Sequence, residues 1–283
     1  MSLDLFVCDV GHGDAIIIKF PSGKVALIDC GGKDTKSASV YLEALKIKKL
    51  DYLAISHPHV DHIRDIINVN SKFYPAVLGR NKIFTKEKIK DENADVFDTH
   101  EDIINKYLEM NTDFSESVSG DPEKDPTMPE WGNVANIVSF SNNDPNMNLN
   151  NLSRALFVKH DSHVILCPGD LEEKGWLKLL ENPNFVKELK KVTILIAPHH
   201  GRDSGFCNEI FQHFTPQVTI VSDGRFGDTS ATDRYCAVTN DAGITLSKPD
   251  GQKENRKVLS TRNDGLIFVA IMDDGDLLIS SNG

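Results

Sequence analysis

The chain has 283 residues, of which 40% are hydrophobic, so it is long enough to bury a sizeable core as one α/β domain. Its 42 acidic and 31 basic residues give a formal net charge of −11, which argues against tight unaided binding of a polyanion. No stretch of the sequence approaches the ~20 apolar residues that span a bilayer, and the N-terminus enters a strand-like segment rather than a signal peptide. We therefore expect a cytoplasmic protein that does not contact membranes.

Three short β-rich runs open the chain and predict consecutive antiparallel strands. These runs are 3–10, 15–20 and 24–29. A glycine turn at 11–13 separates the first two runs and is flanked by Asp9 and Asp14. Because glycines allow a close backbone approach, we expect this turn to lie against a functional site, with turn capping as the alternative role of both aspartates. An amphipathic helix is predicted over 36–48.

The five cysteines are scattered, odd in number and never spaced C-x-x-C. Most stand in apolar runs, which favours buried free thiols in a reducing compartment. Their positions are Cys8, Cys30, Cys167, Cys207 and Cys236.

A cluster of metal-ligand residues follows the strand predicted over 51–56. It comprises His57, His59, Asp61 and His62. Side chains two apart on an extended segment point the same way, and the next turn brings the last two residues toward the same point. Imidazole with carboxylate suits zinc, and also manganese or iron when more carboxylates join. A chance cluster on a surface loop is the alternative, which the full H-x-H-x-D-H spacing disfavours.

The region 70–150 carries the least information. A helix is predicted over 95–110, whereas 111–130 and 141–150 are rich in turn-forming residues and predict loops. Long loops within a compact domain are often lids or binding loops, and a mobile insertion without a role is equally compatible. We expect one domain, 1–283, with an inserted helical and loop excursion at about 70–150.

The second half of the chain offers a further carboxylate at the end of a strand. A hairpin is predicted over 153–167, and Pro168–Gly169–Asp170 follows it directly. A helical run over 171–180 comes next. This position suits Asp170 as a metal ligand that bridges two ions.

The apolar strand predicted over 192–197 ends in a polar loop that contains His199 and His200. Either imidazole can point into the cleft that strand ends form, and we expect at least one to reach the metals or the scissile group. Arg202 and Ser204 follow on the same loop and could hold a phosphate oxygen, although an ordinary surface loop explains them equally well. The remaining strands are predicted over 217–222, 257–261, 265–271 and 276–280.

Six segments together resemble the metallo-β-lactamase-fold hydrolases, and in particular the hydrolase domain of the DNA-uptake competence family ComEC/Rec2. The segment D-V-G-H-G-D at 9–14 resembles the D-V-G-Q-G-D of that family. The others are L-I-D-C-G at 27–31, the H-x-H-x-D-H motif, N-N-L-S at 150–153, P-G-D at 168–170 and H-H-G at 199–201. The resemblance covers nearly the whole chain and implies an α/β (α+β) fold, the metallo-β-lactamase αββα sandwich.

The resemblance also implies a ligand set. His57 and His59 would hold one metal, Asp61 and His62 a second, with Asp170 shared between them. Two divalent ions are expected, zinc most likely and manganese or iron as alternatives.

Further positions of the resemblance concern residues around the metals. Asp29 resembles a residue that orients a ligand, as do Asp9 and Asp14. Asn150 and Asn151 stand where lactamase-type members carry another histidine, so the first site would either be weak or be completed by His199, His200 or His12. Relatives carry a G-H-P histidine near 228–232, and this chain has Asp–Thr–Ser–Ala–Thr there.

The reaction implied is metal-assisted hydrolysis, because a bound metal lowers the pKa of water from 15.7 to about 7. Similarity to the competence branch implies phosphodiester hydrolysis of nucleic acid or nucleotides, with Asp61, His199 and His200 as catalytic residues and Arg202 and Ser204 as substrate contacts. The acidic balance favours a small nucleotide, single strands, or delivery by a protein partner, and a homodimer is possible. Two alternatives stay open: acyl hydrolysis of a lactone, thioester or amide, and a metal-stabilised binding protein without turnover.

Overall fold

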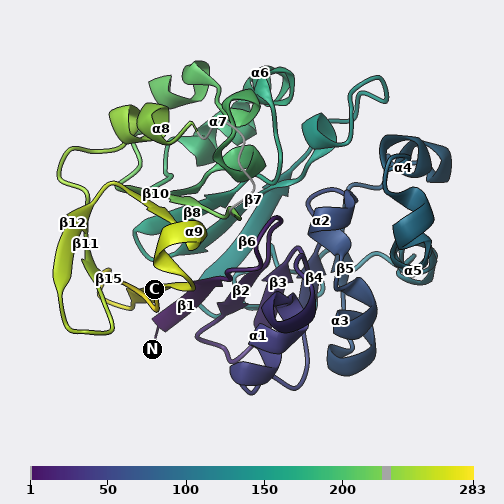
Figure 1. Cartoon of the computed structure of the whole chain (residues 1–283), viewed down its shortest axis with the longest axis horizontal. Helices are drawn as coiled ribbons and strands as arrows, with labels where there is room; N and C mark the ends of the chain where they lie inside the picture. Colours follow the sequence, from purple (N-terminus) through teal and green to yellow (C-terminus); the bar gives the residue numbers. More distant parts are fainter. Residues whose placement is uncertain (1, 225–230) are drawn as a thin grey trace.

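The computed structural model describes residues 2–224 and 231–283, and within them two β-sheets pack face to face (Figure 1). The larger sheet has nine strands in the order β12 (Lys253–Arg256), β11 (Ile244–Ser247), β15 (Leu277–Ser281), β14 (Ile267–Met272), β1 (Ser2–Val7), β2 (Ile16–Lys19), β3 (Val25–Ile28), β4 (Tyr52–Ala54) and β5 (Leu78–Gly79). The smaller sheet has six strands in the order β13 (Val258–Ser260), β10 (Val218–Val221), β9 (Ile194–Ile196), β8 (His163–Cys167), β7 (Ala155–His160) and β6 (Ala135–Phe140).

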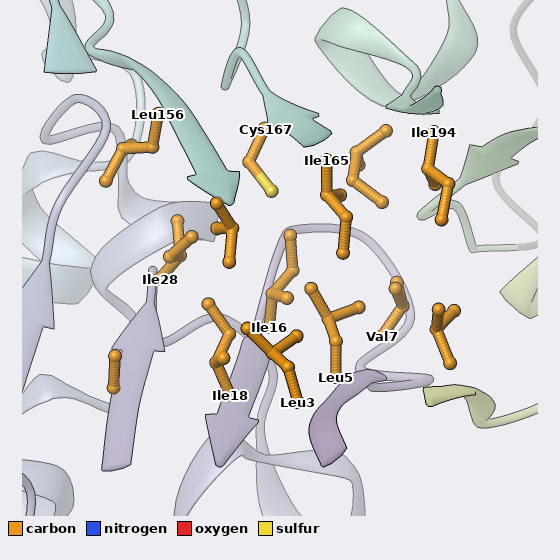
Figure 2. Close-up of a cluster of buried hydrophobic side chains, with 14 of the residues drawn as sticks. Leu3, Leu5, Val7, Ile16, Ile18, Ile28, Leu156, Ile165, Cys167 and Ile194 are labelled. Carbon is orange, nitrogen blue, oxygen red and sulfur yellow. The ribbon is translucent and has the colours of Figure 1, made fainter. Parts of the chain in front are cut away.

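The core between the sheets follows from alternation along the strands. On β1, Leu3, Leu5 and Val7 face the smaller sheet, whereas Phe6 belongs to the apolar layer on the outer face. Successive side chains of a strand point to opposite faces, so apolar residues on both faces require cover on both. Figure 2 shows these side chains of β1 opposite residues of the smaller sheet, Ile165 and Ile194 among them.

Helices cover both outer faces. The larger sheet is covered by α1 (Ala38–Ala44), α2 (Val60–Ile63), α3 (Ile66–Phe73), α4 (Lys86–Glu92) and α5 (Phe97–Asp113). The smaller sheet is covered by α6 (Glu173–Leu180), α7 (Pro183–Leu189) and α8 (Thr232–Val238), and the short α9 (Thr261–Asp264) joins β13 to β14. The predicted αββα sandwich is therefore confirmed.

Several predicted elements have different boundaries. The first strand ends at Val7 rather than at residue 10, and two helices, α2 and α3, follow the histidine pair at 57 and 59. The prediction of one domain with an excursion at 70–150 stays a prediction. The structure shows that this region supplies β5 and β6, which are edge strands of the two sheets.

Two sequence expectations concern the chain as a whole. All five cysteines are free, and only Cys236 is not fully buried. Within the described residues no helix combines the length and apolar character needed to cross a membrane.

The strand directions explain where a site can form. β8, β9 and β10 run parallel to one another, so the loops that follow them leave the sheet at the same edge. These loops carry Asp170, His199 and His200, and Ser222. Gly169 lies against Ser56, which connects this edge to the histidine motif after β4.

Candidate metal centre

Four side chains converge on one point, two from α2 and one each from the loops after β8 and β9. Asp61, His62, Asp170 and His200 each offer a ligand atom, and these atoms all lie within 4.8 Å of one another. His62 Nε2 lies 3.2 Å from Asp170 Oδ1, and His200 Nε2 lies 3.4 Å from Asp61 Oδ2 and 3.6 Å from Asp170 Oδ2. Ligand atoms about 2.0–2.2 Å from a tetrahedral ion are roughly 3.4 Å apart, so these separations fit a shared cation.

Three of the converging atoms have no hydrogen-bond partner among the described residues. His62 Nε2, His200 Nε2 and Asp170 Oδ1 are buried and make no hydrogen bond with any described residue. Buried polar atoms without partners are costly, and their convergence is explained by a cation. The residues therefore fit a divalent transition metal held by two imidazoles and two carboxylates.

The second nitrogen of each imidazole is anchored. His62 Nδ1 lies 2.9 Å from Asp29 Oδ2, and His200 Nδ1 donates to the carbonyl of Ser222 at 3.0 Å. A proton on Nδ1 leaves Nε2 with a lone pair directed at the cluster, which is the arrangement that metal-bound histidines adopt. Asp29 is itself fixed, because it accepts from the backbone N–H and the hydroxyl of Ser56 at 2.7 Å each.

His57 and His59 form a separate pair. Both side chains lie beside the cluster, with His57 Nε2 3.9 Å from Asp170 Oδ2. The two rings contact each other, since His57 Nε2 lies 2.9 Å from His59 Nδ1. In the described part of the chain, no three ligand atoms including theirs come together as closely as those of the four-residue cluster. The expectation that these histidines hold the first metal stays a prediction.

The pKa shifts of the imidazoles in the four-residue cluster differ from that of His57. Burial alone would lower the pKa of His62, but Asp170, Asp61 and Asp29 outweigh it and raise that pKa well above its usual value. Burial would also lower the pKa of His200, but Asp170 and Asp61 raise it to about 9, with Asp14 adding to their effect. Burial, strengthened by neighbouring His62, lowers the pKa of His57 well below its usual value.

The cluster thus favours positive charge at His62 and His200, whereas His57 stays a neutral imidazole. The pKa of Asp61, which faces these imidazoles, shifts in the opposite direction. Burial would raise the pKa of Asp61, but His62, His12 and His200 outweigh it and hold the pKa well below its usual value. A cation that binds here replaces protons on the imidazoles.

The loop after β9 delivers both histidines through an unusual backbone. His199 and His200 have φ values of 50° and 55°, and Gly201 follows with 73°. Left-handed conformations are uncommon for residues other than glycine, and three in succession turn the chain back sharply. As a result His200 is buried in the cluster, and His199 lies at its rim with Nε2 3.7 Å from Asp170 Oδ2.

Arg202 and Ser204 both contact His199. Arg202 Nη1 donates to His199 Nε2 at 3.2 Å, and Ser204 Oγ lies 2.8 Å from His199 Nδ1. Since the arginine occupies the Nε2 lone pair, His199 is held at the rim rather than in the four-residue cluster. Both predicted substrate contacts therefore lie beside the candidate metal centre.

The glycine turn at 11–13 lies against the site, as expected. A Cβ on Gly13 would lie 2.2 Å from the carbonyl oxygen of Asp61, and one on Gly31 would lie 2.3 Å from the same atom. Asp14 is buried, with Oδ1 3.7 Å from His200 Nδ1. Asp9 instead pairs with Lys36 Nζ at the surface, so the structure does not bring it to the cluster.

His12 is the residue that the sequence analysis underweighted. Its Nε2 lies 3.2 Å from Asp61 Oδ2, and its ring centroid is 4.8 Å from that of His200. Its side chain is 36% exposed, so it connects the cluster to solvent. The sequence feature that could have indicated this role is the histidine at position 12, where the resembled ComEC/Rec2 family has glutamine.

The two asparagines do not replace a ligand directly. Asn150 and Asn151 donate through Nδ2 to the two oxygens of Glu172, at 3.3 Å and 2.9 Å. Glu172 Oε1 in turn lies 3.6 Å from His199 Nδ1. Of the segment that stands in place of the G-H-P histidine, residues 228–230 lie outside the described residues.

A cavity of about 650 Å³ is lined by Glu172 and Ser204, both of which contact His199. Its lining is polar and mostly acidic or amide-bearing. Among the residues that line it are Asp144, Asn148, Asn151, Glu172, Glu173 and Ser204.

Comparisons with known proteins agree with this architecture. Residues 8–91, which include the histidine motif, match the family model of the metallo-beta-lactamase superfamily. A search of curated proteins finds no significant match. The matches described here do not single out the ComEC/Rec2 branch, so that resemblance stays a prediction.

The solved structures to which this chain is similar are distant in sequence. A diphosphatase from the PhnP family is 12% identical, with 92% of this chain and 95% of that chain covered and a TM-score of 0.43. Igni18, a metallo hydrolase from Ignicoccus hospitalis, is 13% identical with 84% and 87% covered and a TM-score of 0.43. YhfI from Bacillus subtilis, a metallo-beta-lactamase fold protein, is 14% identical with 69% and 70% covered and a TM-score of 0.38.

Proposed function

We propose that this chain, which has the metallo-β-lactamase fold, is a metal-dependent hydrolase that cleaves phosphodiester bonds in a small nucleotide-like substrate. The observation that carries the proposal is the convergence of Asp61, His62, Asp170 and His200, in which His62 Nε2, Asp170 Oδ1 and His200 Nε2 are buried without a hydrogen-bond partner among the described residues. Zinc is the first candidate from this donor set, and manganese and iron are the alternatives.

Divalent metal at this centre would supply Lewis acidity and a nucleophile at neutral pH. The residues of the chain position that chemistry. Asp29 and the carbonyl of Ser222 fix the rings of His62 and His200, so their Nε2 atoms cannot rotate away. His12 lies at the solvent side of Asp61 and is within reach of a proton that enters or leaves there.

Arg202 favours an anionic substrate. Its guanidinium lies beside His199 at the rim, where a phosphate oxygen can accept two hydrogen bonds from one arginine. The neighbouring cavity, lined by Glu172 and Glu173, repels a long polyanion and accommodates hydroxyl or amine groups. Together these features favour a compact phosphodiester over duplex nucleic acid.

The test is turnover by purified protein loaded with Zn²⁺ or Mn²⁺. The panel consists of a chromogenic phosphodiester, cyclic dinucleotides, single-stranded DNA, RNA, nitrocefin and a lactone. Cleavage of phosphodiesters supports the proposal. Cleavage of only nitrocefin or the lactone contradicts it in favour of acyl hydrolysis, and metal binding without any turnover leaves the binding-protein alternative.

Arg202→Lys sharpens the test of substrate charge. Lysine keeps the positive charge and loses the planar fork, so KM should rise while kcat and metal content change little. Arg256→Lys is the matched control, because Arg256 lies on the edge strand β12 and pairs with Glu254 and Asp264. An unchanged KM in Arg202→Lys would remove Arg202 from substrate binding.

A further inference from the structure

A second cavity, of about 500 Å³, lies at the edge of the sandwich where β5 ends one sheet and β6 is nearby at the end of the other. None of the four residues of the metal cluster lines it. Its walls come from β5 and from the segment 113–127. Four cationic side chains line it: Arg80, Lys82, Lys124 and Arg154.

Arg154 is partly buried without a counter-charge. Its Nη1 donates to the Tyr52 hydroxyl at 3.2 Å, and its Nη2 donates to the Ser139 hydroxyl at 2.5 Å. Within the described residues it forms no ion pair with a carboxylate. A guanidinium is seldom buried unless paired, so these neutral contacts hold its plane in place and leave its charge uncompensated.

Arg80 has a similar environment. It donates to the carbonyl oxygens of Leu78, Asn111 and Phe114 at 3.1, 2.7 and 2.8 Å, and forms no ion pair with a described carboxylate. Burial lowers the pKa of Arg80, and the charge of Arg154 lowers it further. Two guanidinium groups therefore share this edge without an acid between them.

Two lysines add positive charge to the cavity, because no ion pair with a described residue neutralises them. Lys82 and Lys124 are exposed and make no ion pair with any described residue, whereas Lys106 and Lys178 pair with glutamates three residues on. Unpaired cations gathered in one cavity are unexpected in a chain with a net charge of −11.

Three carboxylates also line the cavity, and they do not neutralise it equally. Asp125 is occupied, because it accepts from the backbone N–H groups of Gly120 and Thr127 at 2.7 and 2.9 Å and from the Thr127 hydroxyl at 2.7 Å. Asp113 and Glu116 are exposed to solvent. Asp125 keeps its charge but is turned toward these donors, so four cations face three carboxylates and the cavity lining has a net charge of +1. Serine hydroxyls on 115–119 supply additional donors.

We propose that this edge cavity binds the phosphate group of a small organic phosphate, with Arg154 as the fork and Lys82 and Lys124 as flexible charges. An arginine fork matches two phosphate oxygens, and lysines with hydroxyls satisfy the remainder. The volume lies within the range of small-molecule sites. This site is separate from the proposed catalytic centre and does not depend on its reaction.

The experiment titrates the full-length protein with inorganic phosphate and with adenosine monophosphate as probes, by calorimetry. Lys82→Gln/Lys124→Gln is compared with Lys48→Gln/Lys49→Gln, which removes two exposed lysines elsewhere. We expect at least about tenfold weaker binding of adenosine monophosphate in the first variant, since charge-assisted hydrogen bonds are lost, and less than about twofold change in the second.

The outcomes separate this cavity from the metal centre. Arg154→Lys should also weaken binding, with an unchanged Tm as the check on folding. Equal weakening in both double-lysine variants, or no binding by the native chain, overturns the proposal. Binding that is lost on chelation of metal or in His200→Ala, but kept in Lys82→Gln/Lys124→Gln, assigns the phosphate to the metal centre and also overturns it.

Discussion

The two halves of the histidine motif are organised differently. Around Asp61 and His62, imidazole and carboxylate atoms converge without bonding to one another, and His200 is held in place from behind. Around His57 and His59, the two rings bond to each other at 2.9 Å and must separate before both can bind an ion. His57 is anchored from behind as well, because its Nδ1 lies 3.1 Å from Ser56 Oγ. The difference teaches that anchoring the second nitrogen is not enough, and that the nitrogen facing the metal must also be left unbonded. We expect the second half to be the tighter site.

The largest effect is expected from the carboxylate that both halves approach. Asp170→Asn keeps the shape and removes the charge that lies near His57, His62 and His200. Metal content should fall close to zero and turnover to background, as measured by elemental analysis and a phosphodiester assay. Asp95→Asn, at an exposed position, is the control. Full metal content in Asp170→Asn would show that the halves do not share this ligand.

The comparison of the halves is tested by a pair of histidine variants. His200→Ala should weaken binding of the tightest ion by more than about 100-fold, which exceeds the usual effect of a residue that only orients a ligand. His59→Ala should leave that ion bound and reduce only the second equivalent. Competition with a chromogenic chelator measures both, and His213→Ala serves as control. Equal losses in the two variants would contradict the ranking.

A smaller effect is expected from the residue behind His62. Asp29→Asn removes the carboxylate that holds Nδ1 at 2.9 Å and should weaken metal binding about 10–100-fold. Ser56→Ala deletes a hydroxyl that donates to Asp29 and should have less effect, because the backbone N–H of Ser56 still holds the carboxylate. If Asp29→Asn binds metal as the native chain does, the ring of His62 is fixed by packing alone.

The smallest effect concerns the glycine turn. Gly13→Ala places a methyl group 2.2 Å from the Asp61 carbonyl and should lower the free energy of unfolding by about 1–3 kcal/mol. Gly23→Ala is the matched control, since Gly23 also has a positive φ but no atom lies within 4 Å of its added Cβ. Denaturant unfolding compares the two. If the Gly13→Ala protein is no less stable than the Gly23→Ala protein, the backbone around Gly13 and Asp61 moves to accommodate the methyl group.

Sequence reasoning succeeded where the signal is local. The spacing from His57 to His62 brings neighbouring side chains to one end of β4, and the runs at 3–10, 15–20 and 24–29 predict the antiparallel pairs of β1 with β2 and β2 with β3. It missed β12, because Lys253–Arg256 has no apolar alternation and pairs only at the sheet edge.

Two features of the site depend on geometry that no residue pattern encodes. The choice between His199 and His200 follows from two left-handed residues in succession. The separation of Asp9 from Asp14 follows from a distant partner, Lys36. His12 was visible in the sequence, but its value depends on the position of Asp61 across the turn.

The left-handed backbone at His199 and His200 lowers the stability of the fold, whereas activity depends on it. Each such residue costs roughly 1–2 kcal/mol relative to a right-handed conformation, a cost that glycine avoids. A library of variants selected only for resistance to heat should therefore accumulate glycine at these two positions. The same library would lose metal binding as its melting temperature rose, because the strained positions carry the ligands. Engineering this scaffold for robustness requires a simultaneous screen for bound metal.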